Sequence, residues 1–343
     1  MKITLVTTMR NEGAHLLEWI AHHRAAGVSD FLVYTNDCED GTEALLELLP
    51  NVTHVPLEDG AKPPQWRALK AAWDHPVVAN SDWVLCIDCD EFINLDNGLQ
   101  SIPDLISNID ADMILLPWRL FGHSGHAGLS DTPTCERFTR AAPENLLYPA
   151  IGSYFKSMFR RDGPFRQLGV HRPKQKNPER HGLPRIVDGS GRPVPDRTAA
   201  NDGQIMLWGK PIARDLVQLY HYSVRSAADF MLKRGRGLPN HQEKSIDLTY
   251  WVERNFNTVE DHSIARMGPE TQAFMQDLMV LSGVPEAQAA CRAWHKSRFE
   301  ALMQEPDELK LYGRLLLAEG AAHLPEPVAL DLIRRYGQVH GSN

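Results

Sequence analysis

The sequence predicts an α/β fold, with a mostly parallel β-sheet flanked by helices and a helical extension at the C-terminal end. Residues 3–55 alternate between apolar β-type runs and helix-spaced segments in the order strand, helix, strand, helix, strand. The apolar run at residues 83–87 is followed at once by acidic residues, which indicates a buried strand of the same sheet. From residue 271 onward, the apolar residues recur with helical spacing.

Hydrophobic spacing and turn-forming residues define the elements in order. We expect strands at residues 3–7, 31–35, 52–55, 83–87, 113–118 and 212–221, and helices at residues 14–26, 42–49, 65–73, 99–108 and 226–236. Gly27 is expected to end the first helix. Residues 177–203 are rich in Pro, Gly, Arg and Asp and have no periodicity, so we interpret them as an irregular segment that acts as a mobile lid.

The composition disfavours several classes of protein. A chain of 343 residues with a net charge of −8 is a poor default candidate for binding nucleic acid. There is no stretch of about 18 apolar residues, so no membrane span is predicted, and the first residues enter a strand without the pattern of a signal peptide. Five cysteines, an odd number, argue against a disulfide framework. We expect Cys86 and Cys89 to be buried thiols and the location to be cytoplasmic.

Three acidic residues follow the central apolar run. Asp88 and Asp90 are two residues apart, so in a continuing strand their side chains share one face while Glu91 lies on the other. No basic residue lies close in sequence to neutralise them, and buried carboxylates are costly unless they are paired or bind a metal. Two oxygen ligands on one face suit Mg²⁺ or Mn²⁺. The alternative is a solvated acidic turn.

Polar residues also follow the first two strands, where ligands bind in open parallel sheets. Arg10 and Glu12 either hold a nucleotide by their side chains or form a solvated turn. Asn36, Asp37 and Asp40 are able to accept hydrogen bonds from a base or a ribose, and Asp40 is equally suited to cap the next helix. No G-x-G-x-x-G follows the first strand and no G-x-x-x-x-G-K-[ST] is present, which disfavours the two common phosphate-binding loops.

Three stretches carry a resemblance when they are taken together. They are Thr7-Thr8-Met9-Arg10-Asn11-Glu12, Tyr34-Thr35-Asn36-Asp37-Cys38-Glu39-Asp40-Gly41-Thr42 and Ile87-Asp88-Cys89-Asp90-Glu91-Phe92. In combination they resemble family 2 glycosyltransferases, and more closely the bacterial branch related to family 92 glycosyltransferases. The match is strongest over residues 1 to about 125, and residues 120–126 and 219–226 also look familiar.

The resemblance implies a GT-A-type, Rossmann-like fold, a nucleotide-diphosphate sugar donor, expected to be a UDP-sugar, and a divalent metal, Mn²⁺ or Mg²⁺. By position, it implies that the nucleoside is contacted by Arg10, Glu12, Asn36, Asp37 and Asp40, and that Arg67 lies near the diphosphate. Asp88 and Asp90 would be the Asp-x-Asp pair that reaches the nucleotide and the metal. His221 would complete the metal coordination, with His171 as its alternative.

Residues 119–170 are expected to form the acceptor side. The resemblance implies an inverting transfer, which needs a group that takes the proton from the acceptor hydroxyl. We expect this base to be Glu136, with Asp131 as the second choice, and the alternative for each is a surface residue. A group of basic residues either neutralises the departing diphosphate or forms a basic edge: Lys156, Arg160, Arg161, His171, Arg172 and Lys174.

The domain organisation follows from this interpretation. We expect a transferase domain at residues 1–225, with a nucleotide-sugar-binding half at 1–118 and an acceptor half at 119–225, and a helical region at 226–343 that packs on it or mediates a homodimer. The expected acceptor is a hydroxyl group of a glycan, such as a cell-surface polysaccharide, or of a small molecule. Two alternatives remain, a nucleotidyltransferase acting on a sugar phosphate and a sugar-nucleotide-binding protein without turnover.

Overall fold

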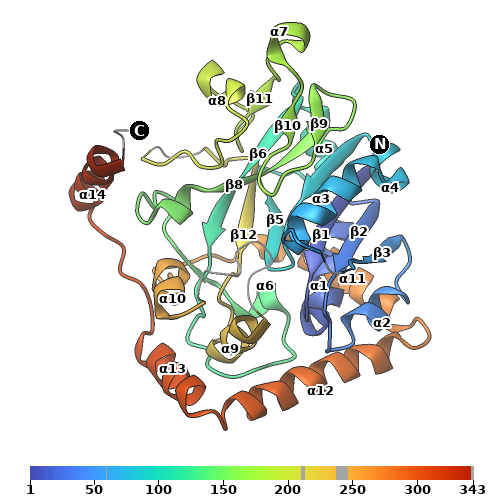
Figure 1. The fold of residues 1–343 in the computed structure, drawn as a ribbon, viewed down its shortest axis with the longest axis vertical. Coiled ribbons are helices and arrows are strands. Elements are labelled where there is room, and N and C mark those ends of the chain that lie inside the picture. The colour runs from blue at the N-terminus through green and yellow to red at the C-terminus, as the bar shows by residue number, and fades with distance from the viewer. Residues whose placement is uncertain (59, 210–212, 237–245, 341–343) are drawn as a thin grey trace.

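The computed structural model describes residues 1–58, 60–209, 213–236 and 246–340, and it is built on a large curled sheet with helices on both faces (Figure 1). The strands of this sheet are β1 (Ile3–Met9), β2 (Asp30–Thr35), β3 (Val52–Pro56), β4 (Trp83–Cys86), β5 (Glu91–Leu95), β6 (Met113–Leu120), β8 (Phe155–Arg160), β11 (Ile186–Val187) and β12 (Val217–His221). Their order across the sheet is β3-β2-β1-β4-β8-β6-β12-β5, with β11 also beside β6.

Most neighbouring strands are parallel. The exceptions are β8, which pairs antiparallel with both β4 and β6, and β5, which pairs antiparallel with β12. Consequently the C-terminal ends of β1, β2, β4, β6 and β12 point toward the same side of the sheet. The predicted α/β fold with a mostly parallel sheet is confirmed, and this shared edge is what positions the site.

The first half of the chain lies close to the sequence prediction. Its helices are α1 (Gly13–Ala25), α2 (Thr42–Leu46), α3 (Pro64–Asp74), α4 (Pro76–Ala79) and α5 (Ile102–Ser107). Helices α2 and α5 are shorter than expected. Gly27 follows α1 with a φ of 99°, a conformation that glycine adopts without a steric penalty, so it ends the helix as predicted. The strand predicted at residues 212–221 is β12, and residue 212 lies outside the described residues.

The acidic residues after β4 do not continue the strand. β4 ends at Cys86, and Cys89 and Asp90 form a turn that leads into β5. The Glu91 amide donates to the Asp88 carbonyl over 3.0 Å, and the Glu91 carboxylate accepts from the Asp88 amide over 2.7 Å. The prediction that Asp88 and Asp90 share one face of a continuing strand is therefore wrong, because these two hydrogen bonds close a tight turn.

The segment between β6 and β12 is built from short elements. They are α6 (Thr134–Arg137), β7 (Arg140–Ala141), η1 (Ala150–Ser153), β9 (Phe165–Gln167), β10 (Lys174–Gln175), α7 (Pro178–His181) and α8 (Asp196–Ala200). Residues 177–203 contain α7, β11 and α8, so the prediction of an irregular segment is wrong. Elements of two to five residues are too short to show a hydrophobic period. The role of this segment as a lid stays a prediction.

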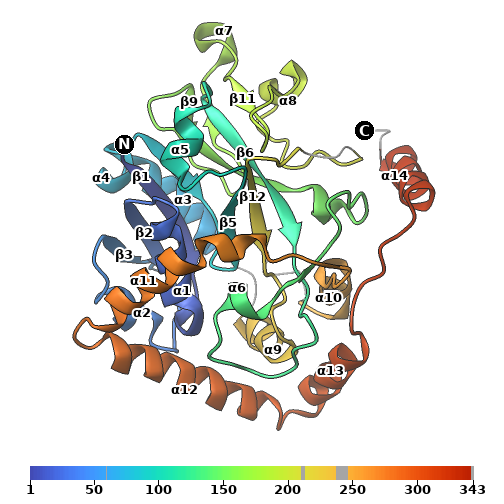
Figure 2. The same ribbon diagram turned by 180° about the vertical axis from the view of Figure 1, so that it is seen from behind.

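The C-terminal region is helical, as predicted. It contains α9 (Ala227–Arg236), α10 (Leu248–Arg254), β13 (Val259–Glu260), η2 (Ser263–Met267), α11 (Gly268–Met279), α12 (Val284–Leu302), α13 (Pro306–Leu317) and α14 (Glu326–His340). Helices α11 and α12 pack against α1 (Figure 2), and Gln288 of α12 donates to the Ala14 carbonyl over 3.0 Å. No helix in the described part of the chain is long and apolar enough to cross a membrane.

The hydrophobic core lies on both faces of the sheet. Alternate residues of β1 point to opposite faces, so Leu5 belongs to the cluster with Trp19 of α1, and Val6 belongs to the cluster with Ala68 of α3. All four are fully buried. Burying one such aliphatic side chain stabilises a fold by about 1.5–3 kcal/mol. The two clusters hold the sheet rigid and thereby fix the strand ends.

Candidate active site

The strand ends open into a cavity of about 1130 Å³, here called the central cavity. Side chains from the ends of five strands line it, together with residues of α3, α9 and α10. The strand-end residues are Arg10, Asn36, Asp37, Asp88, Asp90, Trp118 and His221. The structure thus brings together residues that are up to about 200 positions apart in the sequence.

The turn that carries Asp88 and Asp90 is held by the segment after β12. The Tyr222 amide donates to the Asp90 carbonyl over 2.8 Å, and the Arg225 guanidinium donates to the Cys89 carbonyl over 2.9 Å. Arg225 is buried and has a φ of 49°, a conformation that costs energy for a residue with a side chain. These contacts fix the backbone of the turn and so the direction of both carboxylates.

Asp90 is buried and nevertheless ionised. Its Oδ2 lies 2.7 Å from Nζ of Lys233, and its Oδ1 lies 3.6 Å from Nε2 of His221. Burial by itself raises the pKa of Asp90, but Lys233 and His221 favour the charged form and hold the pKa well below its usual range. Burial lowers the pKa of His221, so its imidazole is neutral at pH 7 and retains a lone pair for a ligand.

Asp88 pairs with Lys156, a residue that the sequence suggested for the departing diphosphate or for a basic edge. Lys156 of β8 is fully buried, and its Nζ lies 2.9 Å from Asp88 Oδ2 and 3.6 Å from Glu91 Oε2. Gln65 of α3 donates to Asp88 Oδ1 over 3.1 Å. Burial raises the pKa of Glu91 well above its usual range, which favours its neutral form. Asp88 is therefore the main ion-pair partner of the Lys156 ammonium.

The acids have no basic neighbour in the sequence, as expected, but lysines distant in the sequence neutralise them. Lys156 is 68 positions from Asp88, and Lys233 is 143 positions from Asp90. Local sequence does not reveal such pairs, because the sheet and α9 bring them together. The solvated acidic turn is excluded as well, since Asp90 and Glu91 are buried.

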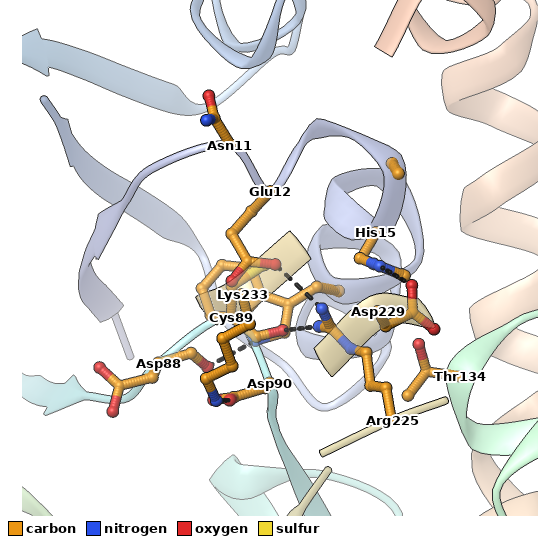
Figure 3. A network of polar contacts seen from close by, with 12 residues as sticks. Asn11, Glu12, His15, Asp88, Cys89, Asp90, Thr134, Arg225, Asp229 and Lys233 are labelled. Atoms are coloured by element: carbon orange, nitrogen blue, oxygen red, sulfur yellow. Dashed lines mark hydrogen bonds and ion pairs between the residues drawn. The ribbon is translucent and has the colours of Figure 1, made fainter. Parts of the chain in front are cut away.

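Glu12 belongs to a buried ionic network (Figure 3). Its carboxylate pairs with Arg225 over 3.0 Å and also with Arg236 of α9. Arg236 donates in turn to the Arg10 carbonyl over 2.7 Å. Burial raises the pKa of Glu12, but Arg236 and Arg225 lower it to about 2. The turn after β1 is therefore not solvated; it is tied to α9, and Arg10 and Glu12 both line the central cavity.

The three polar residues after β2 have different positions. Asn36 and Asp37 line the central cavity, and Asn36 Nδ2 donates to Asp37 over 2.9 Å. Asp40 is instead buried and is not among the described residues that line the cavity. It accepts from the amides of Gly13, over 2.8 Å, and Thr42, over 2.9 Å, and pairs with His295 of α12 over 2.9 Å. The capping interpretation of Asp40 fits these contacts.

Arg67 and the predicted basic group are only partly brought to the cavity. Arg67 is not among the described cavity residues, and it donates to the carbonyls of Glu58 and Lys62 in the preceding loop. His171, Arg172 and Lys174 do line the cavity. Arg160 and Arg161 lie at the far end of β8, where Arg160 pairs with Asp162 and Arg161 stacks over Trp73 at 3.8 Å.

Glu136 and Asp131, the predicted bases, lie on the surface. Glu136 is exposed on α6, and Asp131 has a 75% exposed side chain that pairs with Arg292 over 3.4 Å. Neither is among the described residues that line the central cavity. Both followed from an assumption that residues 119–170 form the whole acceptor side, whereas α9 and α10 supply part of the cavity wall.

Several residues that line the central cavity were not predicted as site residues. Lys233, Tyr250 and Glu253 line the central cavity, and the last two belong to α10, a helix that was not predicted. The sequence did contain a signal for Lys233. Lys233 and Arg236 are three residues apart in a predicted helix, so their side chains share one face of it. Charge on one face of a helix next to a strand end was a usable indication of a binding site.

The donor chemistry of the cavity fits a divalent cation. Among the described residues, no three His, Cys, Asp or Glu side chains form a group that could hold a metal ion by itself. Asp88, Asp90 and His221 nevertheless line the same cavity, and Asp90 and His221 face each other across 3.6 Å. Mg²⁺ and Mn²⁺ commonly take only one or two carboxylates from a protein and complete their coordination with water and phosphate oxygens. Asp88, Asp90 and His221 fit such a partial set of protein ligands.

The fold and the cavity define an α/β protein with a ligand site at the carboxyl ends of its strands, the place where open parallel sheets bind ligands. The chain belongs to glycosyltransferase family 92, whose family model matches residues 6–181, just over half of the chain. The predicted relation to family 92 is confirmed. The relation to family 2 stays a prediction.

Plant proteins named as glycosyltransferase family 92 proteins are similar to this chain. One from Ricinus communis is 29% identical over 142 residues, covering 38% of this chain and 24% of that protein. One from Oryza sativa subsp. japonica is 29% identical over 135 residues, covering 37% and 22%. One from Arabidopsis thaliana is 25% identical over 172 residues, covering 44% and 29%. The chain thus spans about a quarter of the length of the curated relatives it matches.

Solved structures show a more distant similarity. A putative glucose-1-phosphate thymidylyltransferase from Bacillus anthracis aligns with a TM-score of 0.28 and 12% identity, covering 47% of this chain and 72% of that one. The mannosyltransferase Ktr4p from S. cerevisiae aligns with a TM-score of 0.23 and 10% identity, covering 37% and 42%. Similarities of this size carry no argument about activity.

Proposed function

We propose that this chain transfers a sugar from a nucleotide-diphosphate sugar, expected to be a UDP-sugar, to a hydroxyl group of a glycan or small acceptor, with inversion at the sugar. The observation that carries the proposal is the joint presence of Asp88, Asp90 and the β1 and β2 end residues in one cavity of a family 92 chain. The cavity is large enough for a nucleotide sugar, since ligand pockets typically measure about 300–1,000 Å³.

The side chains of the cavity suggest how the donor is held. Asn36 and Asp37, at the end of β2, are proposed to accept hydrogen bonds from the base or ribose, with Arg10 beside them. Arg172 and Lys174 contribute positive charge to the cavity wall, where it would favour the diphosphate, whereas burial lowers the pKa of His171 to about 4 and leaves its imidazole neutral. Asp40 and Arg67 have structural contacts instead, and we do not assign them to the donor.

Asp88, Asp90 and His221 are the residues that would hold Mn²⁺ or Mg²⁺. Bound there, the ion would supply Lewis-acid neutralisation of the departing diphosphate. The protein's own contribution is a fixed, fully ionised Asp90 carboxylate and a neutral imidazole, both on a turn and a strand end held by backbone hydrogen bonds.

The base that takes the acceptor proton needs an accessible carboxylate in the cavity. Most acidic side chains there already serve another role: Glu12, Asp88, Asp90 and Asp202 pair with distant basic residues, and Asp247 caps α10. Glu253 pairs with its own neighbour Arg254 over 3.2 Å and is 47% exposed. We therefore propose Glu253 in place of Glu136 and Asp131 as the general base.

The direct test is a donor screen. UDP-, GDP- and dTDP-sugars are incubated with the protein, with and without Mn²⁺, and released nucleoside diphosphate is measured. Release that needs Mn²⁺ and falls about 10²- to 10⁴-fold in Glu253→Gln supports the proposal. Release of pyrophosphate from a nucleoside triphosphate and a sugar phosphate would point to the nucleotidyltransferase instead. Binding of a sugar nucleotide without any turnover would indicate the binding protein.

A further inference from the structure

Lys233 occupies the position of a counter-ion on Asp90. Its Nζ lies 2.7 Å from Asp90 Oδ2, and the two side chains are 13% and 9% exposed. Lys233 nevertheless lines the central cavity, so the ion pair is part of the cavity wall. An ammonium at this distance uses a carboxylate oxygen that a divalent cation would also need.

The ammonium is held in place by a few contacts from one side. Nζ also donates to the Ser223 carbonyl over 2.8 Å and lies 5.4 Å from the centre of the Tyr250 ring. Lys233 lies on α9, which begins at a closed capping arrangement in which Asp229 donates its amide to Ser226 Oγ over 3.1 Å. This hydrogen bond fixes the start of α9. The four-carbon side chain of Lys233 is flexible, so its ammonium can move while the helix stays in place.

Lys156 offers an internal contrast. It pairs with Asp88 at a similar distance, 2.9 Å, but it is fully buried between Asp88 and Glu91 and is not among the described residues that line the central cavity. Lys156 is therefore not placed to meet a ligand bound in the cavity, whereas Lys233 lines the cavity together with Arg236.

We propose that Lys233 is a resident counter-ion that competes with the divalent cation for Asp90, and that it donates to the diphosphate of the donor once it is released. This inference rests on the proposed function. A single positive charge and a double one a few ångströms apart repel strongly in a site of low dielectric. The cation alone then binds weakly, whereas the cation and the diphosphate together bind well, because the anion gives the released ammonium a new partner.

This arrangement would couple the two ligands. Binding free energies are reciprocal, so a diphosphate that strengthens cation binding is itself strengthened by the cation. Without the diphosphate, Lys233 keeps Asp90 neutralised and the cavity avoids an unpaired buried charge. Lys233 thus acts as the counter-ion of Asp90 when no ligand is bound and as a hydrogen-bond donor to the diphosphate when both ligands are bound.

The test compares Mn²⁺ binding to wild type and Lys233→Met by the electron paramagnetic resonance signal of free Mn²⁺, without nucleotide. We expect Lys233→Met to bind Mn²⁺ alone at least about tenfold more tightly, because the unpaired Asp90 carboxylate gains a cation without losing an ammonium. Lys233→Arg, which keeps the charge, should stay within about twofold of wild type. Equal or weaker Mn²⁺ binding by Lys233→Met would overturn the inference.

Lys174→Met is the matched control. Lys174 lines the same cavity and pairs with Asp202 over 3.2 Å, so its loss removes the same charge without freeing Asp90. Its affinity for Mn²⁺ alone should stay within about twofold of wild type. A tenfold increase in Lys174→Met as well would overturn the inference, because it would show a general charge effect.

Two further measurements separate this inference from the proposed function. Mn²⁺ should raise the melting temperature of Lys233→Met more than that of wild type, because a ligand that binds the native state stabilises it in proportion to its affinity. Isothermal titration with UDP at saturating Mn²⁺ should show about tenfold weaker binding to Lys233→Met, because the released ammonium that would pair with the diphosphate is missing. If wild type binds no nucleoside diphosphate even with Mn²⁺, the proposed function fails, whereas the comparison of Mn²⁺ alone still decides the role of Lys233.

Discussion

The guanidinium of Arg225 donates to the backbone carbonyl of Cys89 over 2.9 Å, and this hydrogen bond joins the segment after β12 to the turn between Asp88 and Asp90 (Figure 3). The same guanidinium pairs with Glu12 over 3.0 Å. One buried side chain therefore connects the end of β1, the acidic turn and the start of α9. The geometry of the candidate metal ligands therefore depends on Arg225, which is not among the described residues that line the central cavity.

We expect Arg225→Lys to fold but to lose activity. A lysine keeps the positive charge beside Glu12, yet its single ammonium lacks the fork that reaches Glu12 and Cys89 together. The Michaelis constant for the donor with Mn²⁺ should rise about tenfold, measured by nucleoside diphosphate release. Arg225→Ala should in addition destabilise the fold by about 3–5 kcal/mol in urea unfolding, because it leaves Glu12 buried with one partner fewer. Normal kinetics in Arg225→Lys would contradict the positioning role.

Asp90→Asn should abolish sugar transfer while the fold is retained. The amide cannot supply the charge that a divalent cation needs, and activity should fall at least about 10³-fold in the donor assay. Asp162→Asn is the control, because Asp162 is an exposed carboxylate that pairs with Arg160 at the other end of β8. Near-normal turnover by Asp90→Asn, with an unchanged circular dichroism spectrum, would refute the metal role of this residue.

Asp40 and Asp37 should respond differently to the same substitution. Asp40→Asn should lower stability by about 1–3 kcal/mol with little effect on donor binding, because it weakens the hydrogen bonds from Gly13 and His295. Asp37→Asn should leave stability within about 0.5 kcal/mol but raise the Michaelis constant of the donor. Urea unfolding and donor kinetics on both variants test this, and the reverse pattern would place the nucleoside contact at Asp40.

Acid should destabilise the protein partly through His22. Burial lowers the pKa of His22 from 6.5 to about 4, and Nε2 of the ring lies 2.7 Å from the Ile93 carbonyl. Between these values the unfolded chain binds a proton that the folded chain does not. This contribution is therefore complete above pH 6.5 and is lost as the pH falls toward 4, up to about 3 kcal/mol.

Urea unfolding of wild type and His22→Gln at several pH values isolates this contribution. Glutamine keeps a donor for Ile93 but does not titrate, so the variant should lose less stability between pH 6.5 and 4 than wild type does. Parallel pH profiles for the two proteins would show that His22 does not contribute.

Residues 177–203 should become less accessible when the donor binds. This segment contains the short elements α7, β11 and α8. Asp202 and Gly203, at its end, line the central cavity. Limited proteolysis with and without a nucleotide and Mn²⁺ measures the change, and we expect cutting in this segment to slow several-fold. The exposed loop around Asp162 serves as an internal reference. Unchanged cutting at 177–203 would contradict a role as a lid.

The first half of the fold could be predicted because its signals are local. The strands β1 to β4 are apolar runs bounded by polar residues, and Gly27 marks the end of α1. Most of the segment from β7 to α8 could not, because all its elements except β8 have two to five residues and carry no period, and β7, β10 and β11 form by pairing with β13, β9 and β6. Helix α10 was missed for a similar reason, since its seven residues form too short a pattern.

The candidate site divides in the same way. Arg10, Asn36, Asp37, Asp88, Asp90 and His221 were predicted, and each lines the central cavity, because the carboxyl ends of parallel strands meet at one edge. The base was placed in the wrong segment, because no local pattern tells which part of the later chain covers that edge. Asp40 follows the same strand as Asn36, yet its contacts with Gly13 and His295 turn it into the core.

By itself, the sequence determined the order of strands and helices in the first half, the three acidic residues at the end of the central strand and the membership of glycosyltransferase family 92. Only the tertiary structure decided which cations face those acids. Lys156, which pairs with Asp88, comes from β8, and Lys233, which pairs with Asp90, comes from α9. The physical reason is that hydrophobic periodicity acts over neighbouring residues, whereas the ionisation and direction of a buried carboxylate depend on charges that folding brings within 3 Å.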